Sequence, residues 1–317
     1  MRNYVIRRLL WFPVMLVGVS FMLFYLLSAR PGDAAILAIG VNGGSCTECV
    51  ENMRTRLGLD KPFIVQYLNW GKDAARGDLG NSLQTNKPIM GEMRQRLPNT
   101  LEIAFISTLL TLLIGIPAGV ISAVKPGRPI DYTLRVLTIG GLSVPGFWLA
   151  TLLITLPAIW WGWTPLAKFV KFQDDPLGNL RVVFWPALVL AVASAAYVAR
   201  IVRSGMVEML YSDHVRTARA KGLGENAVMI RHVLRTSLVT LITVIGVQLA
   251  GILGGSVIME QIFGVPGIGV MGLQATFAQD YHTVLAVTVI FFSAFMTIQL
   301  LVDVAYAYVD PRIRYQE

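Results

Sequence analysis

The sequence has 317 residues, of which 55% are hydrophobic and only 15% are charged, and its mean hydropathy is +0.60. Soluble domains carry about 25% charged residues, and several apolar runs here reach the ~20 residues that a helix needs to cross a bilayer. These properties exclude a soluble cytosolic enzyme and a disordered chain. The net charge of +8 is typical of a membrane protein with basic cytoplasmic loops, so it does not require a nucleic-acid partner.

Six apolar segments are long enough to span a membrane, and they predict an all-α integral membrane protein. They cover roughly 9–29, 99–123, 136–161, 183–202, 237–259 and 283–309. Basic residues precede the first segment, as they do in a secretory signal, but its length exceeds the roughly 7–15 apolar residues of such a signal. We therefore expect the first segment to be retained as a helix.

The distribution of Lys and Arg predicts which loops face the cytoplasm. With the N-terminus inside, basic residues are about twice as dense in the cytoplasmic pieces as in the outer ones. The cytoplasmic pieces are then 1–8, 124–135, 200–236 and 309–317. Most outer positive charges lie in the first loop, which is long enough to escape the positive-inside rule. The sequence thus predicts six transmembrane helices with both termini in the cytoplasm.

The first outer loop, Arg30–Pro98, is too polar to cross a bilayer, and it holds the only two cysteines, Cys46 and Cys49. On the oxidising side of a membrane, this C-x-x-C spacing favours a short-range disulfide, and a reduced, functionally neutral pair is the alternative. Two thiolates do not complete a tetrahedral zinc site, and His282 is the only histidine on the outer side. We therefore predict no metal site.

The inner loop between the fourth and fifth spans contains a short basic helix. Ser212 or Asp213 can cap its start, and Gly222 is a typical helix stop. Three positive side chains lie between them: Arg216, Arg219 and Lys221. By charge and periodicity alone, such a helix could simply lie on the membrane surface and be held by anionic lipid.

The residues of this loop carry a more specific signal. Arg216-Thr-Ala-Arg-Ala-Lys-Gly222, followed ten residues later by His232-Val-Leu-Arg235, resembles the signature loop of ABC-importer permeases, and specifically the dipeptide/oligopeptide/nickel subfamily. Stretches along nearly the whole chain agree in the right order. They are Arg30–Asp33, Leu57–Pro62, Gly77–Gly80, Glu260–Gly269, Leu301–Tyr306 and Asp310–Arg314. The family's Leu-Pro pair before the fifth span is replaced here by Val239-Thr240.

The resemblance implies a type I ABC importer permease fold. It divides the chain into an N-terminal transmembrane helix, an extracytoplasmic region, a core permease domain with its coupling loop, and a cytoplasmic tail. These parts are 1–30, 31–98, 99–309 with the loop at 204–235, and 310–317. In the family, this loop forms a coupling helix that docks on an ATPase. The docking residues would be Asp213, Arg216, Thr217, Ala218, Arg219, Ala220, Lys221 and Gly222.

The resemblance also implies the partners. They are a second homologous permease, two ATP-binding subunits, an extracytoplasmic solute-binding protein and membrane lipid. This chain has no G-x-x-x-x-G-K-[ST] phosphate loop, so it would bind no cofactor itself, and Mg-ATP would act in the partner ATPases. Solutes of the subfamily include dipeptides, longer peptides, glutathione, nickel complexes and oligosaccharides, and the sequence does not choose among them.

Pathway residues are predicted less directly. Glu260, Phe263, Pro266 and Gly267 are candidates for a gate, because Pro266 ends a helix and a turn there can dip toward the pathway. Ionisable residues in membrane segments mark pathways by default, which adds Glu102 and Asp303. Both glutamates have a structural alternative, pairing or hydration at the outer interface, and Asp303 could instead pair with Arg200 or Arg203.

Two rival functions remain. A stand-alone secondary carrier would show charges and broken helices near the membrane midplane, whereas the charges here are few and lie near helix ends. An integral-membrane enzyme would need clustered catalytic side chains, but the three histidines are scattered.

Overall fold

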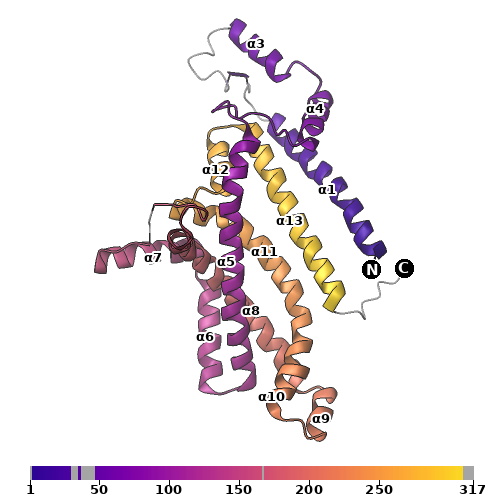
Figure 1. Ribbon diagram of the computed structural model, residues 1–317, viewed down its shortest axis with the longest axis vertical. Coiled ribbons are helices and arrows are strands. Elements are labelled where there is room, and N and C mark those ends of the chain that lie inside the picture. Colours follow the sequence, from indigo (N-terminus) through magenta and orange to yellow (C-terminus); the bar gives the residue numbers. More distant parts are fainter. Residues whose placement is uncertain (1, 30–34, 37–46, 166–167, 310–317) are drawn as a thin grey trace. The chain divides into compact units, whose positions relative to one another are not determined.

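The computed structural model describes residues 2–29, 35–36, 47–165 and 168–309 (Figure 1). Within these ranges the chain is helical, and the only β-pairing is one isolated bridge between Asn81 and Pro88. The expected all-α class is therefore confirmed. The helices are α1 Arg2–Ser28, α3 Thr47–Leu57, α4 Phe63–Ala75, α5 Ile89–Val124, α6 Pro129–Ser143, α7 Gly146–Trp161, α8 Pro176–Leu210, α9 Asp213–Ala220, α10 Glu225–Ala227, the π-helix η1 Val228–Leu234, α11 Arg235–Phe263, α12 Ile268–Phe277 and α13 Tyr281–Val309.

Five of these helices are long and apolar enough to cross a membrane: α1, α5, α8, α11 and α13. A sixth span is formed if α6 and α7 are counted together, but these two helices meet at an angle of 98°. The expectation of one helix over 136–161 is therefore wrong. Pro145 carries no backbone N–H and disfavours helical backbone in the residue before it, and Val144 accordingly adopts extended geometry.

The contacts within the chain define two compact units. The first contains Asn99–Val265 together with residues from Thr297 onward, and the second contains Arg2–Pro98 and Pro266–Met296. The long helices α5 and α13 each contribute residues to both units.

Helix α8 is the centre of the first unit. In its most apolar window 61% of the residues are buried, against 33% or less in the other spanning helices. It packs closely on α5 at two glycines one turn apart. A Cβ atom added at Gly115 would lie 2.8 Å from the Ala195 carbonyl oxygen, and one added at Gly119 would lie 2.7 Å from the Ala199 carbonyl oxygen. This small-xxx-small pattern lets two helix backbones approach each other.

Two apolar clusters hold the first unit together. One joins α5, α7, α8 and the end of α11 through residues such as Ile103, Val183 and Met259. The other joins α5 and α8 to the inner loop. Helix α11 packs closely on its neighbours at two glycines: added Cβ atoms at Gly246 and Gly255 would meet Val302 and Leu190 at 2.9 and 3.0 Å. Gly251 and Gly254, in contrast, face open space.

The second unit contains an apolar cluster that includes Ile89, Met271 and Val287, together with aromatic and polar contacts. The rings of Phe21 and Phe24 in α1 pack against Phe63 and Tyr67 in α4, with centroids 5.1–5.7 Å apart. Elsewhere in the unit, the buried Asp280 carboxylate accepts a hydrogen bond from the Ser82 hydroxyl at 2.5 Å. This hydrogen bond ties the polar region before α5 to the segment between α12 and α13.

Candidate functional site

The short basic helix predicted in the inner loop is α9, Asp213–Ala220. Ser212 occupies the N-cap position with extended backbone, as expected, but its side chain makes no capping hydrogen bond. The Ser212 hydroxyl instead donates to the Met209 carbonyl. Asp213 lies in the first turn, where a negative charge is favourable beside the positive end of the helix dipole.

The predicted helix stop at Gly222 is confirmed. Gly222 has a φ of +78°, its N–H donates to the Arg219 carbonyl at 2.9 Å, and the Leu223 N–H donates to the Ala218 carbonyl at 3.4 Å. These two bonds form a Schellman motif, in which the residue with positive φ is usually glycine because a Cβ atom would be strained there. The chain therefore turns sharply after one short helix.

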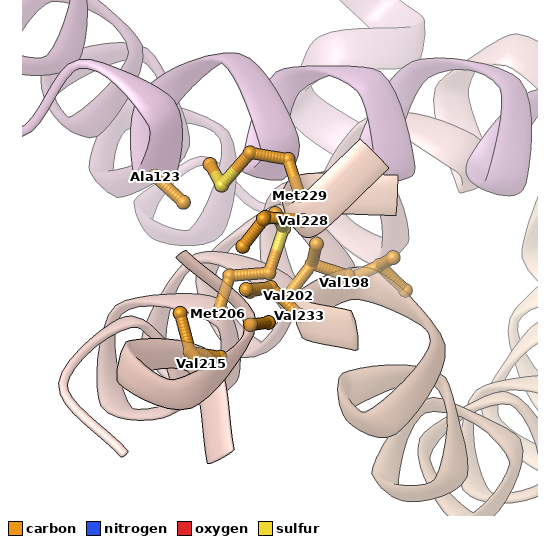
Figure 2. Packing of buried hydrophobic residues seen from close by; sticks show 9 residues of the cluster. Ala123, Val198, Val202, Met206, Val215, Val228, Met229 and Val233 are labelled. Carbon is orange, nitrogen blue, oxygen red and sulfur yellow. The ribbon is translucent and has the colours of Figure 1, made fainter. Parts of the chain in front are cut away.

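Helix α9 has a buried face and an exposed face. Val215 and Ala218 are 0% and 6% exposed, and they belong to an apolar cluster that we call the loop core. Figure 2 shows labelled members of this cluster pointing toward one another. The loop core consists of Ala123 from α5, Val198, Val202 and Met206 from α8, Val215 and Ala218 from α9, and Val228, Met229 and Val233 from η1.

One predicted docking residue lies on the buried face of α9. The Ala218 side chain packs in the loop core of its own chain, and its contact with a partner stays a prediction. The other predicted docking residues are exposed: Asp213, Arg216, Thr217, Arg219, Ala220, Lys221 and Gly222. A helix with only two turns has room for one buried stripe, and the 3.6-residue period places Val215 and Ala218 on it together.

The turn after α9 is closed by an ion pair within the chain. The Arg219 guanidinium donates from Nε to Glu225 Oε2 at 3.1 Å and from Nη2 to Oε1 at 2.5 Å. These hydrogen bonds lower the pKa of the Glu225 carboxyl and raise the pKa of Arg219. The resemblance places Arg219 among the residues that dock on an ATPase, and the structure shows an acidic partner for it six residues along its own chain.

A second ion pair lies where the α5–α6 turn meets α8. The Asp131 carboxylate is 0% exposed and accepts hydrogen bonds from Arg203 Nε and Nη2 at 2.8 and 2.9 Å. It also accepts from the Ser122 hydroxyl at 2.5 Å and from the Gly127 N–H at 2.9 Å. A carboxylate with this many donors is fully paired. The pair holds α8, the helix that leads into the inner loop, against the start of α6.

Sequence reasoning missed this pair. It considered Arg203 as a partner of Asp303, whereas the Arg203 guanidinium is held by Asp131, and the side chain of Asp303 lies outside the described residues. Asp131 lies in the predicted cytoplasmic piece 124–135, where an acidic residue early in a helix needs no special explanation. Only its complete burial reveals its role.

Two of the three acidic residues predicted near the pathway, Glu260 and Glu102, are paired. Glu260 is 0% exposed, and its Oε1 accepts a hydrogen bond from the Thr100 hydroxyl at 2.6 Å. Glu102 accepts from the Asn179 amide at 3.2 Å. These contacts join α5 to α11 and α5 to α8, and they agree with the structural alternative for each residue. A direct role in the pathway stays a prediction.

The remaining gate candidates surround the end of α11. Phe263 is 3% exposed and packs in the apolar cluster of α5, α7 and α8. The helix ends at Gly264, with φ +67°, and Gly267 is the N-cap of α12, so the predicted break around Pro266 is present. Cys46 and the stretches Arg30–Asp33 and Asp310–Arg314 lie outside the described residues, and the Cys46–Cys49 disulfide stays a prediction.

Two family models match the chain. The binding-protein-dependent transport system inner membrane component model matches residues 115–315, and the N-terminal model of the same kind of membrane component matches residues 1–104. The chain belongs to this family. It is therefore a multi-pass permease component of an ABC-type transporter, which excludes the stand-alone carrier considered above.

Relatives match the permease over almost its full length. A Brucella abortus (strain 2308) protein, named as a permease of a peptide transport system, is 40% identical over 96% of both chains. The oligopeptide transport system permease protein AppB of Bacillus subtilis (strain 168) is 37% identical over 99% of this chain and 100% of its own. The dipeptide transport system permease protein DppB of Alkalihalophilus pseudofirmus is 34% identical over the same shares.

Solved structures show the same fold. The permease resembles a chain of the MetNI methionine ABC transporter in an inward-facing crystal form, with a TM-score of 0.55 and 21% identity, over 71% of this chain and 99% of that one. It also resembles a chain of an amino acid ABC transporter solved with histidines, with a TM-score of 0.54 and 17% identity, over 69% and 94%. The predicted ABC importer permease fold is thus confirmed.

Proposed function

We propose that this permease forms half of the translocation pathway of an ATP-driven peptide importer, and that α9 receives the movement of a partner ATPase. The observation that carries this proposal is the two-sided packing of α9. Its inner face is part of the loop core, whereas its outer face presents exposed basic and small residues. A helix held in this way can transmit a push to the spanning helices.

The loop core supplies the route for that push. Val215 and Ala218 of α9 pack with Met206 of α8 and with Val233 of η1, which leads directly into α11. Tightly packed side chains do not deform continuously, so a displaced α9 carries its neighbours with it. Movement of α8 and α11 against the rest of the transporter would then expose the solute alternately to the two sides of the membrane.

The proposed orientation follows from charge. Basic density predicts that both termini and the inner loop lie in the cytoplasm, where ATP is available. The full assembly would contain a second homologous permease, two ATPases that bind Mg-ATP, and an extracytoplasmic solute-binding protein. In support, the family is described as binding-protein-dependent, and the sequence contains no phosphate-binding loop of its own.

The proposed solute is a peptide because three full-length relatives are named for peptide, oligopeptide and dipeptide transport. No residue of the permease need recognise the solute tightly, since an importer of this kind receives it from the binding protein.

A bulky side chain on the outer face of α9 tests the docking role. Ala220 is exposed, so Ala220→Trp should leave the fold intact but obstruct a partner surface. We expect loss of the co-purifying ATPases and of peptide uptake, at normal membrane abundance. Thr133→Trp is the matched control, because Thr133 is an exposed helical residue on the same proposed side and outside the loop. Normal uptake and ATPase recovery in Ala220→Trp would overturn the proposal.

A further inference from the structure

A pocket of about 240 Å³ lies among α5, α6 and α8, outside the loop core. Ala118 of α5 and Ile139 of α6 contribute to its apolar part. Three arginines line it as well: Arg135 from α6, and Arg200 and Arg203 from α8. The pocket therefore combines an apolar lining with three guanidinium groups, which raises the question of which anions pair with these positive charges.

The positive charges of the pocket exceed the negative ones. None of the lining residues is acidic, and the carboxylate in contact with them is the buried Asp131. Its two oxygens accept hydrogen bonds from Arg203 at 2.8 and 2.9 Å, whereas Arg135 Nε lies 3.5 Å away. The Arg200 guanidinium lies over the Tyr197 ring at 5.3 Å. The Asp131 carboxylate is the one acidic group in contact with Arg203 and Arg135, and three guanidinium groups line the pocket, so the positive charges exceed this negative charge by two.

The two arginines that carry this excess are accessible. The Arg135 side chain is 47% exposed, and Arg200 is also exposed. Guanidinium groups present paired N–H donors that match the oxygens of a phosphate. Phosphate oxygens at the mouth of the pocket could accept hydrogen bonds from both.

The apolar lining selects between the sources of such a phosphate. A free phosphate ion gains nothing from Ala118, Leu134 and Ile139, whereas the acyl chain of a lipid buries apolar surface against them. Basic pockets between transmembrane helices at the cytoplasmic side are typical headgroup sites for anionic lipids. In the orientation proposed above, this pocket lies at that side.

We propose that the pocket binds one anionic phospholipid of the phosphatidylglycerol type, with its phosphate on Arg135 and Arg200 and its first acyl carbons against α5 and α6. The lipid would neutralise the excess charge beside the Asp131–Arg203 pair. It would therefore support the position of α8 just before the inner loop. Placing the lipid in the cytoplasmic leaflet depends on the orientation given under the proposed function. The proposal does not depend on docking of an ATPase.

Lipid retention measures this site directly. The purified transporter is exchanged into detergent with equal amounts of phosphatidylglycerol and phosphatidylcholine, and lipids that stay bound to the permease are identified by native mass spectrometry. We expect selective retention of phosphatidylglycerol. Arg135→Gln with Arg200→Gln should weaken that retention roughly fivefold for each arginine, since a basic residue near an anionic lipid contributes about 1 kcal/mol.

Two further variants keep the result interpretable. Arg128→Gln removes an exposed arginine at the start of the same helix α6, outside the pocket lining, and should retain the lipid. Ala118→Phe fills the apolar part while keeping every charge, and should release the lipid but leave binding of inorganic phosphate unchanged. Equal retention of both lipids by the unmodified protein, or retention unchanged in the double arginine variant, would overturn the proposal.

Co-purification of the ATPases, measured on the same samples, separates this proposal from the proposed function. Loss of lipid selectivity with the ATPases still bound would refute the lipid site alone. The proposal would also be refuted if inorganic phosphate displaced the lipid and Ala118→Phe did not release the lipid. Those two results together would assign the site to a free anion.

Discussion

At the scale of single residues, Gly222 shows how a local requirement shapes the inner loop. Its φ of +78° lies in the left-handed region, which costs roughly 1–2 kcal/mol for other L-residues. Gly224, two residues later, has an ordinary φ of −60° and open space around it. The two glycines therefore differ in backbone requirement and not in surroundings.

We predict that Gly222→Val abolishes peptide uptake while the protein still inserts, because the strained turn no longer ends α9 correctly. Gly224→Val is the matched control and should transport at close to the normal rate. Uptake assays, normalised to membrane abundance, measure both. Equal uptake by the two variants would show that the positive φ at Gly222 does not matter for function.

The ion pair between Arg219 and Glu225 is a second feature at the scale of single residues. The lowered pKa of Glu225, caused by hydrogen bonds from Arg219, means that the pair favours the folded loop above the ordinary glutamate pKa. That contribution disappears only as the pH falls through the lowered pKa, so the pair is fully formed at neutral pH.

We predict that Arg219→Glu abolishes transport by placing two carboxylates together, and that adding Glu225→Arg restores much of it by re-forming the pair with reversed charges. The single variant Glu225→Arg should be impaired as well. Uptake and ATPase co-purification report the outcome. Failure of the double variant to recover would instead indicate that Arg219 acts directly on the partner.

At the scale of helices, the contact between α5 and α8 depends on two glycines. Gly115 and Gly119 leave no room for a Cβ atom, since the nearest atoms would be backbone oxygens of α8 at 2.7–2.8 Å. Backbone atoms cannot rotate away as a flexible side chain can. Any larger residue must therefore separate the two helices.

We predict that Gly115→Ala and Gly119→Ala each destabilise the permease by about 1–3 kcal/mol, the usual range for an overpacked site. Thermal unfolding of the purified protein in detergent should show a lower midpoint temperature for both. Gly91→Ala, in the same helix but with nothing within 4 Å of the added Cβ, is the control and should leave the midpoint unchanged. Equal midpoints for all three variants would contradict close packing of α5 on α8.

The break between α6 and α7 is the element for which sequence reasoning was least accurate. The apolar run over 136–161 has the composition of one span, and composition dominated the prediction. Pro145 disfavours helical backbone in the residue before it, but Pro13 and Pro186 lie inside intact helices of this same chain. A proline therefore does not decide by itself whether a helix continues.

At the scale of the whole molecule, the proposed importer requires other chains. The permease belongs to a family of membrane components of binding-protein-dependent transport systems, and in the proposed function its helix α9 receives movement from a partner ATPase.

We predict that the tagged permease, purified from native membranes in mild detergent, brings with it a homologous six-helix chain and P-loop ATPases. Mass spectrometry of the purified material identifies them. The Ala220→Trp variant should retain the homologous permease but lose the ATPases, which separates assembly in the membrane from docking of α9. Recovery of the permease alone would contradict the proposed assembly.

Local sequence determined much of this protein. Apolar runs predicted the spanning helices, Gly222 predicted the end of α9, and the loop motif indicated the family that the comparisons confirm. The spanning helices and the end of α9 depend on residues within one or two helical turns of each other, because hydropathy, helix period and helix stops act over that distance along the chain. The family is indicated by the order of residues in the motif itself.

Only the tertiary structure decided which side chains meet across the bundle. Ala218 turned inward because α8 and η1 offer an apolar surface on that side. Asp131 is paired with Arg203, 72 positions away, and Thr100 with Glu260, 160 positions away. Such pairs depend on how the helices cross and rotate against one another, and that is set by packing of whole faces and not by the sequence near either residue.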